Sequence, residues 1–276
     1  MRHYLDHAAT TPLRAAAREA WLTASEIVGN ASSTHGAGQA ARRLLEDSRE
    51  RAAAVVGCDP IEVVFTSGGT ESINTALRGM WTARAGAARA IVLPDAEHHA
   101  TIDTVAALER EGALVRPVQV DERGRIAVSM FTAALDGAAL ATALIANNEV
   151  GTLNDAVALS RSAAAAGIPL HLDAVSAFGH LPVVFRELRG DAPAGAGLVA
   201  LSLAGHKIGA PVGTGMLVAA RSARIAPLLH GGSQQRGLRA GTQDVPGAAA
   251  LAAALEATEA ERERESSRLA ALRDRL

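Results

Sequence analysis

Residues 201–215 read LSLAGHKIGAPVGTG, and this stretch decides the fold. An apolar run over residues 198–203 predicts a buried strand, followed by a Gly-His-Lys turn and a second apolar strand over residues 216–219. Lys207 therefore ends a buried strand on a tight turn. Partial desolvation there lowers the pKa of the amine and favours a nucleophile that forms a Schiff base with an aldehyde cofactor. The alternative is an ordinary loop lysine in solvent, and the rest of the chain has to decide between the two.

Strand-like and helical patterns alternate on both sides of this stretch. Further strands are expected at residues 61–66, 90–94, 114–120, 143–146 and 169–172, and helices at residues 13–27, 39–56, 73–84 and 245–276. The alternation predicts an α/β fold of three layers, a largely parallel sheet with helices on both faces. Ligands bind such sheets at the carboxyl ends of the strands, and the polar clusters described next all follow strands.

The composition is that of a globular protein without a charged macromolecular partner. The chain has 276 residues, is 49% hydrophobic and carries a formal net charge of -2. That balance gives no case for nucleic acid or a membrane surface as partner. No apolar run is long enough for a membrane span or a signal peptide, so the cytoplasm is the expected location. The single cysteine, Cys58, excludes an intrachain disulfide framework and a cysteine-rich metal site.

A glycine-containing turn, TSGGTES, joins an expected strand to a helix start at residues 66–72. The two glycines let a ligand approach the backbone closely. Free N–H groups and the positive end of the helix dipole then form a cup for a phosphate, and the hydroxyl of Thr70 is a further donor. Ordinary capping of the helix by Ser, Thr or Gly produces the same pattern, so both interpretations stand at this point.

An aspartate ends another expected strand, at Asp173 in the run HLDA. A carboxylate in that setting needs a cationic partner, and the ring nitrogen of pyridoxal phosphate is one, because an acid there keeps the ring protonated as an electron sink. The alternative is an aspartate that caps the next turn. Asn148, after a further strand, offers an amide for a ring hydroxyl or simply belongs to a polar turn.

Two adjacent histidines, His98 and His99, follow the strand at residues 90–94. The imidazole of His98 is suited to stack on a cofactor ring. Adjacent histidines also suggest a metal ion, but their side chains diverge and no companion ligand motif is visible. We therefore expect no metal site.

Eight motifs in order give the chain a resemblance to a known family. They are YLDHAATTP, GNASSTHGAG, VVFTSGGTES, EHHATID, ANNEVGT, HLDAVSAFG, AGHKIGAPVGTG and HGGSQQRGLRAGTQDVPG. From Tyr4 to the end, the chain resembles the cysteine desulfurases of the class V aminotransferases, pyridoxal-phosphate enzymes of fold type I that supply sulfur for iron–sulfur clusters and thiolated tRNA. The resemblance implies a mostly parallel seven-stranded sheet, L-cysteine as substrate, L-alanine as product, transfer of the sulfur and a sulfur-acceptor protein as a partner.

The resemblance also implies roles for individual residues at the cofactor ring. Lys207 would bind the cofactor covalently and, once released, move the α-proton of the substrate. Asp173 would pair with the ring nitrogen, and His98 would stack on the ring and act as acid and base. Asn148 would support the ring oxygen. Ser176 stands where the family usually has a glutamine that donates to this oxygen, and its shorter side chain implies a weaker contact.

A second group of residues is implied to hold the phosphate. Gly69, Thr70 and His206 would bind it within the subunit. Thr242 matches a threonine that reaches the phosphate of the other subunit, so a homodimer is expected. Ala204 replaces a phosphate-binding serine of the family, and Ser202, two residues earlier on the same strand, points to the same face. These changes suggest weaker binding of the cofactor, not its absence.

The largest departure concerns the nucleophilic cysteine and the substrate-binding arginine. In the family both lie in a carboxyl-terminal segment the size of a small domain, and this chain ends before either. We expect an arm and helix start at residues 1–20, a cofactor-binding large domain at 21–250, and at 251–276 the start of a long helix that would lead to the absent small domain. The apolar stretch 245–255 would then be exposed, and the chain would associate beyond a dimer.

Substitutes for these two residues are few. Cys58 is the one thiol, and it is either a small apolar filler or an incidental surface residue. Arg236 and Arg239 are candidates for the carboxylate clamp. Three functions remain open. The first is a desulfurase that is cut short of its small domain or completed by another chain. The second is a pyridoxal-phosphate lyase that acts on cysteine or selenocysteine without a protein thiol, and the third is a silent dimeric scaffold that binds the cofactor or a sulfur-relay partner.

Overall fold

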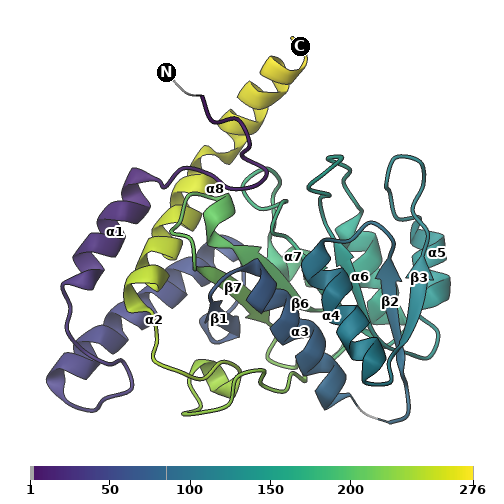
Figure 1. Ribbon diagram of the computed structural model, residues 1–276, viewed down its shortest axis with the longest axis horizontal. Coiled ribbons are helices and arrows are strands. Elements are labelled where there is room, and N and C mark those ends of the chain that lie inside the picture. The colour runs from purple at the N-terminus through teal and green to yellow at the C-terminus, as the bar shows by residue number, and fades with distance from the viewer. Residues whose placement is uncertain (1–2, 85, 276) are drawn as a thin grey trace.

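A seven-stranded sheet in the order β1-β7-β6-β5-β4-β2-β3 forms the centre of the structure (Figure 1). This computed structural model describes residues 3–84 and 86–275. The strands are β1 (Val63–Thr66), β2 (Ala90–Pro94), β3 (Leu114–Val118), β4 (Ala138–Leu144), β5 (Pro169–Asp173), β6 (Gly197–Ala204) and β7 (Gly215–Ala219). Strand β7 is antiparallel to both of its neighbours, and the other pairs are parallel. The predicted α/β fold with a mostly parallel sheet is confirmed.

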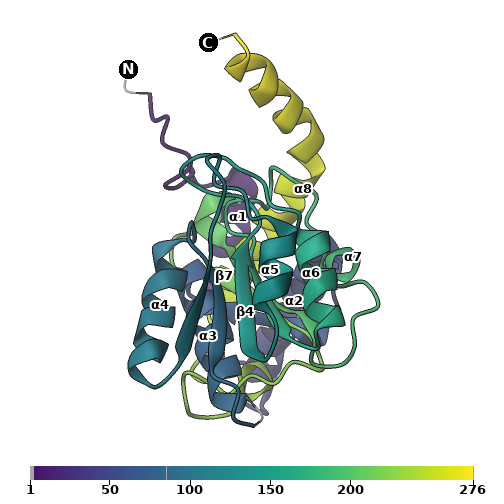
Figure 2. The ribbon, with the colours of Figure 1, turned by 90° about the vertical axis from the view of Figure 1, so that its right-hand side faces the viewer.

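Helices cover both faces of this sheet. They are α1 (Ala15–Ser25), α2 (Gly36–Val56), α3 (Gly69–Ala83), α4 (His99–Arg110), α5 (Val128–Ala134), α6 (Ala156–Ala165), α7 (Phe185–Arg189) and α8 (Val245–Arg273). Figure 2 shows α3 and α4 on one face and α5, α6 and α7 on the other. Because both faces are covered, every residue of β6 is buried.

Strands β4 and β1 differ from their expected bounds for reasons that the structure shows. Strand β4 covers Ala138–Leu144, not residues 143–146. Its sequence AALATAL has little β-branched character, so the strand depends on pairing with β2 and β5 and not on local preference. Strand β1 begins later than expected because Pro60–Glu62 form a 3-10 turn, which Asp59 and Glu62 close as a capping box.

Helix α8 is buried in its first half and more exposed in its second, which extends past the body of the molecule in Figure 1. The expectation that residues 245–255 are exposed is wrong, because all of them except Pro246 are buried. Helices α1 and α2 pack along α8 and cover this stretch. Leu276 and residues 1–2 lie outside the described part of the chain. No described helix has the length and apolar character to cross a membrane.

Candidate active site

A cavity of about 590 Å³ lies at the carboxyl ends of β4, β5 and β6 and beside the start of α3. Parallel strands bring their carboxyl ends to one edge of a sheet, so residues far apart in sequence meet there. The cavity is lined by eight of the nine predicted site residues: Gly69, Thr70, His98, Asn148, Asp173, Ser176, His206 and Lys207. The ninth, Thr242, is exposed on the loop before α8 and does not line the cavity.

Lys207 lies on the short turn after β6, and its amine points into the cavity wall. Its Nζ donates a hydrogen bond to the carbonyl oxygen of Ala8. Burial lowers the pKa of Lys207, and the charges of Asp6, Asp173 and Glu149 oppose this lowering. The amine is thus more readily deprotonated than that of a lysine in solvent, which favours the nucleophile over the ordinary loop lysine.

Asp173 is the last residue of β5 and is only 6% exposed. Its Oδ1 accepts the N–H of Val175 at 2.8 Å. Burial raises the pKa of Asp173, whereas the Val175 N–H and the charges of His98 and Lys207 lower it. Within the described residues no cationic side chain forms an ion pair or hydrogen bond with this carboxyl group. A buried acid that faces a cavity without a bonded cation fits a ligand with a protonated ring nitrogen.

Sequence analysis did not assign a second buried acid, Glu97, which is 8% exposed. Its Oε1 accepts the N–H of Leu144 at 2.8 Å, and its Oε2 has no partner among the described residues. Burial raises the pKa of Glu97 to about 8, and the charge of Asp173 adds to this rise. At neutral pH Glu97 is therefore mainly protonated. Its position next to His98 was the available signal, but only the fold reveals its burial.

His98 begins α4 as its N-cap, and its side chain is exposed to the cavity. The Nδ1 atom accepts the N–H of Ala100 at 3.0 Å, which leaves Nε2 to carry the proton of the neutral ring. Asn148 reaches the same cavity from the turn after β4, where its Nδ2 donates to Glu149 at 2.7 Å. Both side chains thus come from segments that follow strand ends.

The first turn of α3 forms one end of the cavity. Gly68, at the N-cap, has a φ of 156°, and no side chain caps the helix. A Cβ on Gly69 would lie 2.7 Å from Cγ2 of Val175 and 3.3 Å from Cβ of Ala204. The close approach leaves backbone N–H groups at a helix start beside the cavity, as a phosphate site requires.

The segment before α1 forms a further wall that sequence analysis did not assign to the site. Asp6, Ala8 and Ala9 line the cavity. Thr11 donates to the carbonyl oxygen of His206 from its N–H at 2.9 Å and from its hydroxyl at 2.8 Å. The motif YLDHAATTP was the signal, but it contributes largely through backbone and small side chains and so suggests no chemistry by itself.

Comparison with known proteins agrees with this geometry. The family model for class-V aminotransferases matches residues 3–275. The chain belongs to this family. It is 44% identical over 280 residues to an IscS-like cysteine desulfurase of Mycobacterium tuberculosis, covering 99% of this chain and 69% of the relative. It is 38% identical to a cysteine desulfurase of Methanosarcina thermophila, covering 99% of this chain and 66% of that relative. The chain thus spans about two thirds of these curated relatives and belongs to the cysteine desulfurase group.

Solved structures give the same result. A NifS-like protein superposes with a TM-score of 0.94 at 33% identity, covering 100% of this chain and 74% of the other. A structure described as SspA in complex with cysteine has a TM-score of 0.86 at 31% identity, covering 92% of this chain and 72% of the other. The class-V family depends on pyridoxal phosphate, and the cavity around Lys207 has the residues to fit it.

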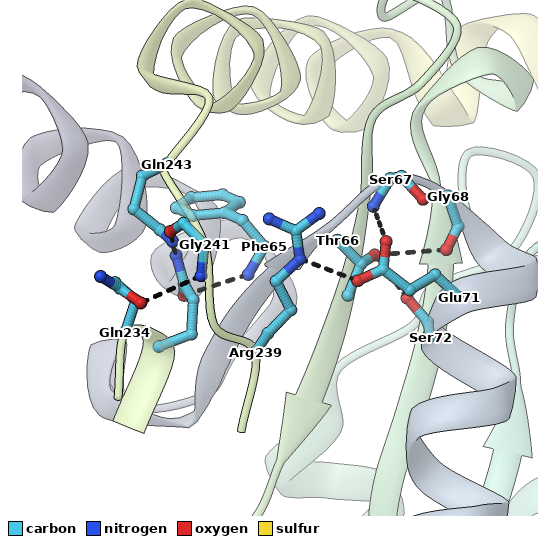
Figure 3. A network of polar contacts seen from close by, with 11 residues as sticks. Phe65, Thr66, Ser67, Gly68, Glu71, Ser72, Gln234, Arg239, Gly241 and Gln243 are labelled. Atoms are coloured by element: carbon cyan, nitrogen blue, oxygen red, sulfur yellow. Dashed lines mark hydrogen bonds and ion pairs between the residues drawn. The ribbon is translucent and has the colours of Figure 1, made fainter. Parts of the chain in front are cut away.

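Three residues considered as substitutes for family residues are engaged elsewhere. Ser202 is fully buried, and its hydroxyl pairs with Nε2 of His171 at 2.8 Å and does not line the cavity. Arg236 donates to the carbonyl oxygens of Ile61 and Ala219. Arg239 forms an ion pair with Glu71 at 2.9 Å (Figure 3). The expectation that these side chains replace a phosphate ligand or a carboxylate clamp is therefore wrong for this arrangement.

Cys58 does not line the cavity either. It is 7% exposed, and its thiol belongs to the core between α2 and β1. Burial raises the pKa of Cys58 to about 12, and the charges of Glu62 and Asp59 add to this effect. A thiol in this environment is not the reactive thiolate that sulfur transfer needs, so Cys58 is an apolar filler. In the described ranges, no group of three or more His, Cys, Asp or Glu residues could hold a metal ion.

Proposed function

We propose that this chain is a pyridoxal-phosphate-dependent, cysteine desulfurase-like enzyme that acts on L-cysteine. The observation that carries the proposal is the placement of an amine of lowered pKa, Lys207, and a buried acid, Asp173, in one cavity that has the first turn of α3 at its end. A related structure contains cysteine, which supports a substrate of this class.

The residues of the cavity suit the parts of the cofactor. Asp173 would bind the ring nitrogen, and His98 would cover the face of the ring. Asn148 and Ser176 would lie toward the ring oxygen. Gly69, Thr70 and His206 would hold the phosphate. When bound, the cofactor supplies an electron sink for a substrate that loses a proton at its α-carbon.

Protons are moved by two groups of the chain. Nζ of Lys207 would take the α-proton of the substrate, because its lowered pKa makes the free amine more available than that of a lysine in solvent. Nε2 of His98 is the second proton-carrying atom, since Nδ1 is occupied by the N–H of Ala100. Glu97, whose pKa burial raises to about 8, retains its own proton near neutral pH.

The fate of the sulfur separates two candidate reactions. In a desulfurase, L-cysteine becomes L-alanine and the sulfur passes to a thiol as a persulfide. Because Cys58 is buried and inert, that thiol would come from outside residues 1–276, in a sulfur-acceptor protein or another chain. The same observation favours a second candidate, β-elimination from cysteine or a related amino acid, which needs no protein thiol.

The assembly and location form part of the proposal. Thr242 is exposed on the loop before α8, and we propose that it contacts the partner's phosphate in a homodimer. Residues 21–250 would form the cofactor-binding domain, with 1–20 as an arm and 251–276 as the start of a connection to a small domain. The cytoplasm is the proposed location.

The visible absorption spectrum tests the cofactor site. We expect the purified chain, mixed with pyridoxal phosphate and dialysed, to retain a band that borohydride removes, with the reduced cofactor attached to Lys207 by mass spectrometry. Lys207→Ala, folded by circular dichroism, should retain neither the band nor the label. No band in the intact chain would refute the proposed function.

Product analysis then distinguishes the two reactions. With L-cysteine and an added thiol as sulfur acceptor, a desulfurase forms L-alanine. A lyase forms pyruvate and sulfide, with or without that thiol. Cofactor binding without either product would leave a silent scaffold and contradict the proposed enzyme.

A further inference from the structure

The loop at residues 233–243, which carries Thr242, is attached to the edge of the sheet. Strand β1 is an edge strand, and the N–H of Phe65 on this strand donates to Oε1 of Gln235 at 3.2 Å. The same oxygen accepts Nη1 of Arg49 at 2.8 Å. An edge N–H that would otherwise face solvent thus becomes an attachment point for the loop.

A second attachment joins the same loop to the turn before α3, as Figure 3 shows. Nε of Arg239 donates to Oε1 of Glu71 at 2.9 Å, and Oε2 of Glu71 accepts the N–H of Ser67 at 2.7 Å. The side chains of Glu71 and Arg239 are only 14% and 22% exposed. Burial alone would raise the pKa of Glu71, but the bonds from Arg239 and Ser67 outweigh it and the pKa is lowered. The carboxylate therefore stays ionised and paired.

The backbone of this loop depends on such attachments. Ser233, Gln235 and Arg236 have φ values of 60°, 49° and 61°, and they are the non-glycine residues with positive φ in the described chain. Residues other than glycine keep this conformation where the surroundings determine it. Within the loop, Oε1 of Gln234 accepts the N–H of Gly241 at 3.0 Å. The position of Thr242 thus follows from contacts at both ends of the loop.

We infer that the Glu71–Arg239 pair couples the phosphate cup, residues 66–72, to the loop at residues 233–243. Both residues are positioning residues, and the inference rests on the proposed function because the ligand of the cup is the cofactor phosphate. Glu71 holds the turn that carries Gly69 and Thr70. Its ion pair with Arg239 fixes the position of the loop relative to that turn. Coupling is reciprocal, so a filled cup orders the loop and an ordered loop strengthens binding in the cup.

In the proposed homodimer this pair has a further consequence. The loop of one subunit carries Thr242 toward the phosphate of the partner. The pair links that loop to the subunit's own cup. In that dimer the pair would connect the two cofactor sites, from Glu71 through Arg239 to Thr242.

Hydrogen exchange with and without pyridoxal phosphate tests the coupling. In the wild type we expect the cofactor to slow exchange in peptides from residues 66–72 and from residues 233–243. Arg239→Gln and Glu71→Gln should remove the effect on the loop and weaken cofactor binding about tenfold, the order expected for a lost charged hydrogen bond. The double variant should be no weaker than either single variant, because both break one interaction.

A matched control comes from the other end of α3. Arg78→Gln removes an ion pair of 2.6 Å between α3 and Glu111, at the C-cap of α4, and it should leave loop protection and cofactor affinity as in the wild type. Thr242→Ala tests whether the coupling depends on the Glu71–Arg239 pair or on Thr242 itself. Protection of the loop should survive in Thr242→Ala, because the pair acts within the subunit. If that variant abolishes protection while Arg239→Gln preserves it, the coupling is overturned.

The pair can also be tested without the cofactor. In the ligand-free protein, Arg239→Gln should speed exchange in residues 66–72, and Arg78→Gln should not. A wild type that binds no cofactor would refute the proposed function. The exchange rates of the ligand-free variants would then still decide whether the pair holds residues 66–72. A wild type that binds the cofactor, with exchange and affinity unchanged in Arg239→Gln, would refute the coupling alone.

Discussion

Lys207 donates a hydrogen bond from Nζ to the carbonyl oxygen of Ala8, 199 residues earlier in the chain. The segment before α1 is therefore part of the environment of the amine. Asp6, in the same segment, opposes the lowering of the Lys207 pKa that burial causes, together with Asp173 and Glu149. The N-terminal segment thus helps to set the reactivity of the proposed nucleophile.

Replacement of Asp6 by Asn should lower the pKa of Lys207 further. The change removes a negative charge that favours the ammonium form, while an amide oxygen can still accept the N–H of Ala9, as Oδ1 of Asp6 does at 3.2 Å. We would measure the rate of acetylation of Lys207 against pH in the cofactor-free protein by mass spectrometry. The profile of Asp6→Asn should shift to lower pH.

The exposed acid Asp95 offers a matched control for this experiment, because it is absent from the charges that act on Lys207. Asp95→Asn should leave the acetylation profile unchanged. Equal profiles for the wild type and Asp6→Asn would show that the segment before α1 does not tune the amine.

Glu97 should make the protein less stable as the pH rises. Its folded pKa of about 8 lies above the ordinary value of 4.5. Between these values the unfolded chain loses the proton and the folded chain keeps it, so the free energy of unfolding falls with rising pH, by at most about 1.4 kcal/mol per pH unit. Glu97→Gln has no proton to lose, and its stability should fall less between pH 5 and pH 8.

Urea unfolding at several pH values checks this prediction. Glu122→Gln, which changes an exposed acid, serves as the control and should follow the wild type. If the free energy of unfolding of Glu97→Gln has the same slope against pH as that of the wild type between pH 5 and pH 8, Glu97 is ionised in the folded protein.

The sequence was sufficient to predict the fold and to place most residues of the candidate site in one cavity, because both have local signals. Strand β6 is a continuous apolar run, and Lys207 follows directly after its turn. Asp173 is a lone acid at the end of a second apolar run. The rule that strand ends meet at one edge then brings these residues together without further information.

The parts that sequence reasoning missed depend on contacts between distant segments. The burial of Glu97 follows from its bond to Leu144 after the pairing of β2 with β4. The role of Arg239 follows from its contact with Glu71, 168 residues away. Likewise, the hydroxyl of Ser202 was expected near the phosphate, but on the neighbouring strand His171 lies within reach and binds it. No local pattern predicts such pairings.

His171 should make the protein sensitive to acid. It is fully buried between Thr142, 2.9 Å from its Nδ1, and Ser202, 2.8 Å from its Nε2. Burial lowers the pKa of His171 to about 3, from an ordinary value of 6.5. As the pH falls from 6.5 toward 3, the unfolded chain binds a proton at this histidine and the folded chain does not. The free energy of unfolding therefore falls by up to about 1.4 kcal/mol per pH unit.

His171→Gln separates this effect from packing. The variant should be less stable at pH 7 by about 1–3 kcal/mol, because it loses the fitted ring and its paired bonds. Its stability should nevertheless fall less steeply between pH 6.5 and pH 4, as measured by urea unfolding. The exposed His230→Gln is the control. If His171→Gln has the same slope as the wild type, proton uptake by His171 does not limit acid stability.

Gly69→Ala should damage the phosphate cup through one methyl group. The added Cβ would lie 2.7 Å from Cγ2 of Val175, closer than real contacts allow, so the first turn of α3 must shift. We expect weaker binding of pyridoxal phosphate in absorbance titrations and a loss of about 1–3 kcal/mol in stability. Gly36→Ala, at the start of α2 with no atom within 4 Å of the new Cβ, should bind the cofactor normally and be stabilised by about 0.4–1 kcal/mol.

The clash itself can be removed to test this cause. Val175→Ala deletes the methyl group that Gly69→Ala would contact, while the N–H of residue 175 still donates to Asp173. The double variant should therefore recover part of the cofactor affinity that Gly69→Ala loses. The remaining deficit reflects Ala204, whose Cβ would lie 3.3 Å from the added carbon. If Val175→Ala restores no affinity at all, crowding at the start of α3 is not what Gly69 prevents.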